Sequence, residues 1–192
     1  YKDVIKAIKV ARKNNLRVWL TYVITKNNTN KINYKHILSL AKEFSLTVFF
    51  QPVVDYKNCG LKTKDLLPNK TKYRTMIKDL IKIKKENNSE IGNSLIGLKN
   101  LHQWPNLNNL KTKCCAGKLM AHIYPDGQVY PCFNKIYHKT LNAKNGFTRA
   151  FNQINNKKLS KCPGCWTYAT IEFNQLLSLN INSVFNTIKL LK

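Results

Sequence analysis

The sequence predicts an α/β fold, and three observations carry that prediction. Segments with apolar residues at helical spacing alternate with short β-branched and aromatic runs in the first half of the chain. This alternation is typical of a parallel sheet covered by helices. From Pro105 the pattern changes to an Asn-rich linker, a cysteine cluster and two helical segments. We therefore expect two domains, 1–105 and 106–192.

In the first half, a helix is expected to be followed by a strand at two successive places. Residues 3–13 show helical spacing and residues 16–24 form a β-branched and aromatic run, which predicts a helix followed by a strand. The order recurs as a helix at 33–44 and an apolar run at 46–53 that contains Pro52, which is typical of a buried strand. Two strands do not make a stable α/β domain. Because the chain also begins with Tyr rather than Met, we expect further strands upstream, in a longer protein.

The remaining segments are predicted to be mostly helical. Residues 54–70 read as a loop, 71–86 as a helix with Met76 in the core, and 90–103 as a second helix. Pro125-Asp126-Gly127 lies between two β-prone arms, about 119–124 and 128–131. Pro presets φ, Asp caps the turn and Gly accepts a positive φ, so a small hairpin is expected there.

Composition narrows the function classes. The chain has 33 Lys and Arg against 9 Asp and Glu, a formal charge of +24, which favours a polyanion partner such as nucleic acid. Only four of these cations are Arg, the residue that grips phosphates bidentately, so the charge is a weak argument. No apolar run approaches the ~20 residues of a membrane span, and no targeting segment is visible, so we expect a cytoplasmic protein with no membrane partner. The sequence contains no P-loop, Gly-x-Gly-x-x-Gly or Gly-x-Ser-x-Gly motif.

Cysteines carry the most specific chemical signal. Cys114 precedes the first hairpin arm, Cys132 follows the second, and Cys162-Pro163-Gly164-Cys165 forms a knuckle whose two thiolates can face one ion. Four such thiolates suffice for a tetrahedral Zn²⁺ or a [4Fe–4S] cluster. The wide separation of Cys114 and Cys132 is unlike the paired knuckles of zinc ribbons and modestly favours the cluster. Cys59, alone in a loop, is interpreted as a free thiol.

These residues resemble a known family. Residues 114–165 contain Cys-x-Ala-Gly, then Pro-Asp-Gly-x-Val-x-Pro-Cys and later Cys-x-x-Cys. This order of motifs resembles the auxiliary-cluster region (SPASM or twitch type) of radical S-adenosylmethionine enzymes. The preceding α/β segment resembles the later part of their partial (β/α)₆ barrel, which would be followed by a small α+β auxiliary-cluster domain. By this resemblance Cys114, Cys132, Cys162 and Cys165 ligate an auxiliary [4Fe–4S] cluster. Cys115 holds the variable position and could substitute for Cys114.

The resemblance also implies cofactors and partners. S-adenosylmethionine with a second [4Fe–4S] cluster would serve the full-length enzyme, and Gln51, at a strand end, would line the S-adenosylmethionine pocket. The substrate would be a peptide or a small molecule, and a flavodoxin or ferredoxin would donate electrons. The family's Cys-x-x-x-Cys-x-x-Cys motif is absent from these residues, so we expect it upstream and expect this portion alone to be inactive. No Cys follows Cys165, which matches one auxiliary cluster. The alternative is a Zn-stabilised, basic nucleic-acid-binding module.

Overall fold

The fold is known from a computed structural model. It describes residues 1–54, 63–86, 90–110, 112–132, 141–154, 159, 162 and 164–191. The longer helices are α1 (Lys2–Lys13), α2 (Lys31–Glu43), α3 (Lys70–Lys85), α4 (Leu95–Leu101), α5 (Phe147–Asn152), α7 (Tyr168–Leu177) and α8 (Ile181–Leu191). The strands are β1 (Trp19–Ile24), β2 (Thr47–Pro52), β3 (His122–Ile123) and β4 (Val129–Tyr130). Short 3₁₀ turns occur at Lys64–Leu66, Leu107–Asn109 and Ala143–Asn145.

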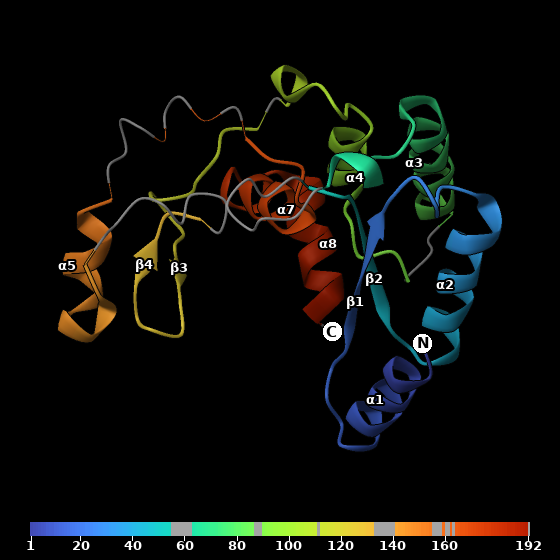
Figure 1. Cartoon of the computed structure of the whole chain (residues 1–192), viewed down its shortest axis with the longest axis horizontal. Coiled ribbons are helices and arrows are strands. Elements are labelled where there is room, and N and C mark those ends of the chain that lie inside the picture. The colour runs from blue at the N-terminus through green and yellow to red at the C-terminus, as the bar shows by residue number, and fades with distance from the viewer. Residues whose placement is uncertain are drawn as a thin grey trace.

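The centre of the molecule is a parallel pair of strands between helices (Figure 1). β1 and β2 pair in register from Trp19 opposite Thr47 to Ile24 opposite Pro52. Neighbouring residues of β2 point to opposite faces: Phe50 packs on the side of α2 and α3, and Phe49 stacks on Tyr168 of α7. The predicted α/β class is confirmed. The finer prediction of a partial barrel is not shown, because the described strands form only this pair and a hairpin.

The edge of β2 that is not paired with β1 is covered by residues 90–94, for which the predicted helix is wrong. Residues 90–103 were predicted to be helical throughout, but helix α4 begins only at Leu95, with Ser94 as its N-cap. Before it, Ile91 makes a parallel bridge to Val48, and the Asn93 amide bonds both the N–H (2.7 Å) and the C=O (3.1 Å) of Phe50. Asn93 is fully buried, so its side chain replaces a strand neighbour at this edge.

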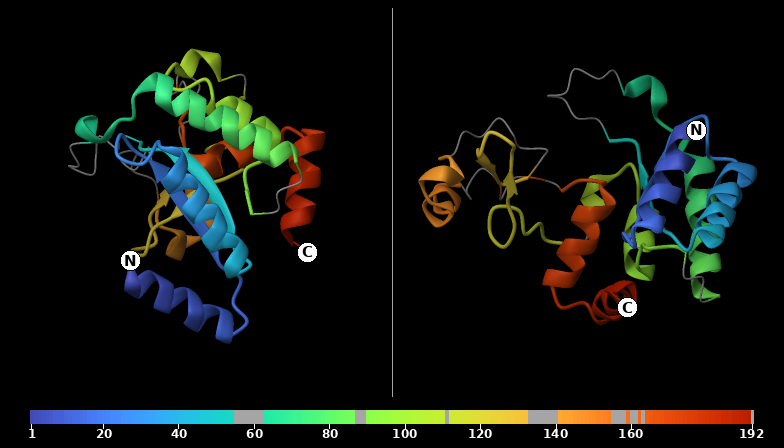
Figure 2. Two further views of the ribbon diagram at one scale, coloured as in Figure 1. Left: turned by 90° about the vertical axis from the view of Figure 1, so that its right-hand side faces the viewer. Right: turned by 90° about the horizontal axis from the view of Figure 1, so that it is seen from below.

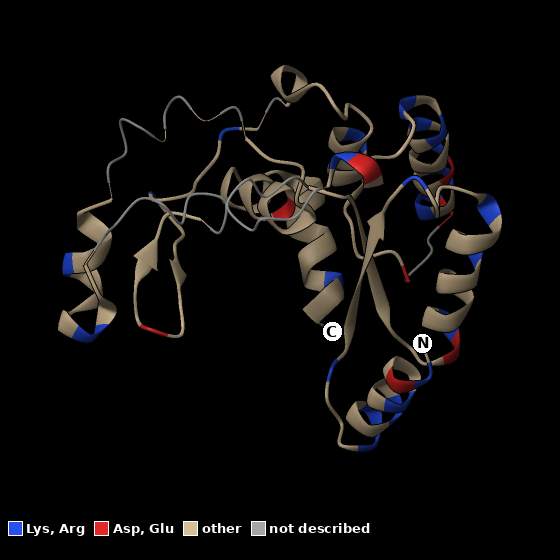
Figure 3. Ribbon diagram, in the orientation of Figure 1, with Lys and Arg blue, Asp and Glu red and all other residues tan. Residues whose placement is uncertain are grey.

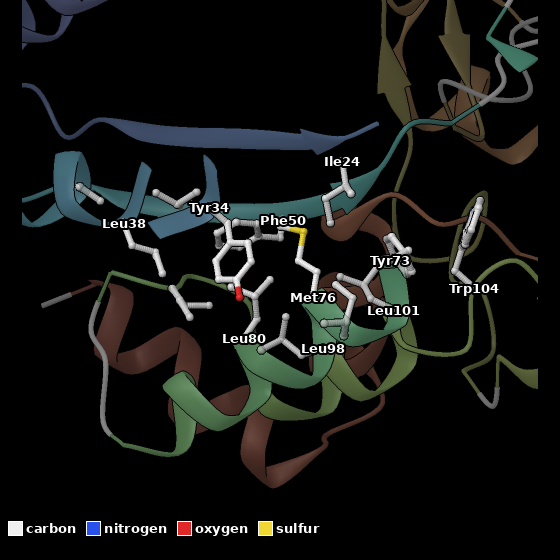
Figure 4. Close-up of a cluster of buried hydrophobic side chains, with 14 of the residues drawn as sticks. Ile24, Tyr34, Leu38, Phe50, Tyr73, Met76, Leu80, Leu98, Leu101 and Trp104 are labelled. Carbon is white, nitrogen blue, oxygen red and sulfur yellow. The ribbon is translucent and has the colours of Figure 1, made fainter. Parts of the chain in front are cut away.

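The main hydrophobic core lies between the sheet and helices α2, α3 and α4 (Figure 4). Met76 is 1% exposed there, which confirms its predicted core position. Trp166 and Ile171, from the second half of the chain, belong to this same core. The proposed boundary at residue 105 remains a prediction, and the described core already extends across it.

A smaller apolar cluster holds the hairpin. Val129, Ala150 and Ile154 are buried together, away from the main core, and the hairpin and α5 stand to one side of the sheet in Figures 1 and 2. The predicted turn is confirmed: Asp126 Oδ1 accepts from the Gln128 N–H (2.9 Å) and Gly127 has φ +86°. The paired part of each arm is only two residues long, shorter than predicted.

Helix α7 is attached to α4 through a buried carboxylate. Glu172 Oε1 accepts from the Ser94 N–H (2.9 Å) at the start of α4. Burial raises the pKa of Glu172 to about 7, although hydrogen bonds from Ser94 and the charge of Lys84 act in the opposite direction. Lys84 is itself half-buried and donates to the Ile91 carbonyl (2.6 Å). The orientation of α7 relative to α4 therefore depends on the polar contacts of Glu172, Ser94 and Lys84.

No helix among the described residues is both long and apolar enough to cross a membrane.

Candidate metal centre

The segments that carry the predicted ligands meet around Gly117. This glycine follows Cys114 by three residues and has φ +70°, a conformation that L side chains rarely adopt. A Cβ placed there would lie 2.5 Å from a methyl of Leu159, 2.8 Å from Ile154 and 3.2 Å from Pro131. Pro131 precedes Cys132, and Leu159 is three residues before Cys162. The missing side chain of Gly117 therefore allows the three cysteine-bearing segments to approach one another.

The Cys114 thiol lies close to the thiols of two other predicted ligands. Burial raises the pKa of the Cys114 thiol, and the nearby thiols of Cys165 and Cys162 raise it further. Hydrogen bonds from the Ala116 backbone and the Asn174 side chain lower it. A thiol with neighbouring thiols and N–H donors is in the environment that a metal thiolate requires.

The knuckle is shaped by a second glycine. Gly164, between Cys162 and Cys165, has φ +98°, and a Cβ there would lie 3.3 Å from a methyl of Leu110. The Cys162 N–H donates to the Leu159 carbonyl (2.9 Å). Cys162 and Cys165 are both half-buried, with free thiols. Gly164 thus adopts a backbone conformation that L side chains rarely take.

The thiols are neighbours without forming a closed coordination shell. Within the described ranges, no three Cys, His, Asp or Glu side chains are grouped closely enough to hold a metal ion. Cys132 is half-buried at the end of the hairpin. The donor set of sulfur ligands fits Zn²⁺ or an iron–sulfur cluster in its chemistry. To bind one metal centre, the four cysteine side chains would have to move closer together.

Cys114 and Cys115 face different surroundings. Cys114 has Cys162, Cys165 and Asn174 as neighbours, whereas the Cys115 thiol lies 3.9 Å from the Lys113 carbonyl. The Cys115 backbone N–H donates to Asn174 Oδ1 (2.9 Å). Which of the two thiols ligates a metal remains a prediction. Cys59, predicted to be a free thiol, lies outside the described residues.

Gln51 lies at the end of β2, opposite Val23 of β1. Its side-chain oxygen accepts a hydrogen bond (3.1 Å) from the backbone N–H of Tyr168, which is the first residue of α7. Its described contact thus satisfies one of the unpaired N–H groups at a helix start. The role predicted for it in an S-adenosylmethionine pocket remains a prediction.

Two amides of α7 that the sequence did not single out, Asn174 and Gln175, form hydrogen bonds to the segment 112–115. Gln175 donates to Thr112 Oγ1 (2.7 Å), and Asn100 of α4 lies 3.5 Å from the same oxygen. Asn174 and Gln175 are 4% and 8% exposed. The available signal was an adjacent pair of amides among the apolar residues of the last helical segments, where buried polar groups need partners.

The basic charge has its own distribution. Many Lys and Arg residues lie on α1, α2 and α3 (Figure 3). Helix α1 contributes Lys2, Lys6, Lys9, Arg12 and Lys13. Arg17, next to α1, donates to the carbonyls of Leu190 (2.9 Å) and Leu191 (3.0 Å) at the end of α8.

Comparison with protein-family models, with curated proteins and with solved structures found no match of any kind.

Proposed function

We propose that this chain is the auxiliary-cluster portion of a radical S-adenosylmethionine enzyme. In this proposal Cys114, Cys132, Cys162 and Cys165 ligate one [4Fe–4S] cluster. The observation that carries it is the arrangement of Cys114, whose pKa the thiols of Cys162 and Cys165 both raise. Cys114 is about 50 positions from Cys162 and Cys165 in the sequence, so a shared site for these thiols would have to come from the fold and not from local spacing.

Two further features support the proposal. Gly117 lets the segments before Cys132 and Cys162 pack against the turn after Cys114. The parallel β1–β2 pair, with helices on both sides and Ile91 bridged to Val48, has the repeating order that a barrel segment requires. Both features are also compatible with other α/β proteins, so the cysteine arrangement remains the main support.

In this proposal, each of the four cysteines would contribute to holding the cluster. When bound, a [4Fe–4S] cluster supplies an electron-transfer or substrate-binding centre. The chain would hold it by four thiolates, shield it by the half-burial of those thiols and stabilise their charge by N–H donors. Cleavage of S-adenosylmethionine would need a three-cysteine motif from elsewhere in the protein. The substrate, a peptide or small molecule, and an electron donor such as flavodoxin or ferredoxin belong to the same proposal.

Metal content of matched variants tests the proposal. The chain is purified anaerobically, and iron and sulfide are measured per molecule together with the absorption spectrum. We expect about four irons in the wild type and in Cys115→Ser, by the four-thiolate rule. Cys114→Ser and the Cys162→Ala/Cys165→Ala double variant should lose most of the iron. A wild type without iron after reconstitution, or equal iron in all variants, would refute the assignment.

The same measurements separate the alternative. A Zn-stabilised, nucleic-acid-binding module would be colourless, contain one Zn²⁺ and bind DNA or RNA with an affinity that falls steeply with salt. The observation that favours it is the +24 charge and its concentration on α1 and α3. Replacing Lys2, Lys6 and Lys9 by Gln would then weaken nucleic-acid binding, whereas it should leave an iron–sulfur centre unchanged.

A further inference from the structure

Helix α8 turns a polar side toward the rest of the protein. Ser183 is 1% exposed on that side, and Asn186 donates to the Gly92 carbonyl (2.9 Å). At the end of the helix, the Leu190 carbonyl accepts from Arg17 (2.9 Å). Hydrogen bonds along its length therefore fix the orientation of α8 about its own axis.

The opposite side of α8 is apolar and exposed. Four residues form this side, which we call the α8 stripe, and they are 46–69% exposed: Ile181, Phe185, Ile188 and Leu191. Their spacing of three or four residues places them on one face of the helix. A surface helix normally has the reverse orientation, with its apolar face against the core. In both views of Figure 2, α8 lies at an edge of the molecule, so a partner can reach the stripe.

The exposed apolar surface is large enough for a small interface. Leu177 and Leu179, which precede the stripe in the chain, are exposed as well. Six such side chains together present on the order of 500 Å² of apolar surface. A contact that uses the same surface on two copies would bury about twice that area, close to the ~1,000 Å² that a specific interface needs.

The distribution of charge indicates what covers the stripe. Lys189 is the one charged residue of α8, whereas Lys and Arg make up five of the twelve residues of α1 and seven of the sixteen of α3. An acidic partner would be drawn to those cationic helices, and two copies of a chain with a charge of +24 would repel each other there. A second copy can approach through a surface with few charges, and its own α8 stripe has the matching length, spacing and apolar character.

We propose that the α8 stripe is a homodimer interface, on which a second copy of this chain docks its own stripe. A closed dimer of this kind uses the same patch on both copies, related by a two-fold axis. Phe185 lies near the middle of α8, so its ring becomes the central side chain of the interface. The inference goes beyond the proposed function, because it involves none of the cysteines.

Sedimentation velocity of the full chain tests this inference. The protein is treated with nuclease and kept under anaerobic, reducing conditions, so that neither nucleic acid nor disulfides link the copies. Phe185→Asp and Ile181→Asp each place a charge on the stripe. Ile32→Asp is the matched control, because Ile32 is likewise an exposed isoleucine in the first turn of a helix, α2. Circular dichroism checks the fold of each variant. If Phe185→Asp loses helix, Ile181→Asp decides, because an acidic residue is favourable in a first turn.

The expected results are specific to the stripe. The wild type and Ile32→Asp should form a dimer with a Kd of about 1–100 μM. Phe185→Asp should weaken dimerisation by at least about 30-fold, and Ile181→Asp, at the end of the stripe, by about 5- to 10-fold. Raising the salt from about 0.1 M to about 0.5 M should strengthen the dimer, because it screens the repulsion between the two basic chains.

Three results would overturn the inference. The first is a wild type that stays monomeric throughout a concentration series spanning the expected Kd. The second is a dimer that persists unchanged in the folded stripe variants, or one that Ile32→Asp weakens equally. The third is a wild-type dimer that dissociates as salt rises, which is the behaviour of copies held together by a polyanion.

Discussion

Replacing Gly97 by alanine tests how α7 is attached to the rest of the fold. Gly97 lies in α4, where alanine normally stabilises a helix by about 1 kcal/mol relative to glycine. Here a Cβ would collide with the carboxylate of Glu172, whose Oε1 accepts from the Ser94 N–H. The carboxylate is almost fully buried and would have to move. The substitution should therefore destabilise the protein, contrary to helix propensity.

The magnitude follows from the contact that is lost. A hydrogen bond to a charged group contributes about 1.5–3 kcal/mol, and the buried carboxylate would lose this partner. After the gain in helix propensity is subtracted, we expect Gly97→Ala to lower the free energy of unfolding by roughly 0.5–2 kcal/mol. For a chain of this size that corresponds to a Tm lower by about 1–8 °C.

A double-mutant cycle isolates the Gly97–Glu172 contact. Urea unfolding, followed by circular dichroism, is measured for wild type, Gly97→Ala, Glu172→Ala and the double variant. Once Glu172 is truncated, Gly97→Ala should be neutral or stabilise by up to about 1 kcal/mol, because the carboxylate is gone and only Ser94 Oγ, 3.1 Å from the added Cβ, has to shift slightly. If Gly97→Ala costs the same with and without the Glu172 carboxylate, the proposed collision is wrong.

Two further predictions concern the same region. Burial raises the pKa of Glu172 from 4.5 to about 7, so the folded state binds this proton more tightly than the unfolded state. Stability should therefore fall by roughly 3 kcal/mol as pH rises from about 4.5 to 7, and level off above, relative to Glu172→Gln. Parallel pH curves of urea midpoints for the two proteins would contradict this. Asn93→Ala leaves the buried N–H and C=O of Phe50 without partners and should cost about 2–4 kcal/mol in urea unfolding. The exposed Asn108→Ala is its control, with a change within about 0.5 kcal/mol.

The sequence predicted those features whose signal is local. Apolar spacing located α1, α2, α3 and the two C-terminal helices, because a helix buries one stripe of residues whatever lies opposite. Pro125-Asp126-Gly127 specified its turn because the conformations of those residue types are restricted.

The tertiary structure decided everything that depends on a distant partner. Asn93 lies in a stretch that the sequence predicts to be helical. In the folded chain its side chain instead makes two hydrogen bonds to the backbone of Phe50 in β2, and a short helical turn alone is not stable enough to compete with them. The backbone of Cys115 is likewise bonded by Asn174 of α7, about 60 residues further along the chain. No periodicity records such a contact, because a buried amide is placed by the groups that satisfy it and those groups become neighbours only when the chain folds.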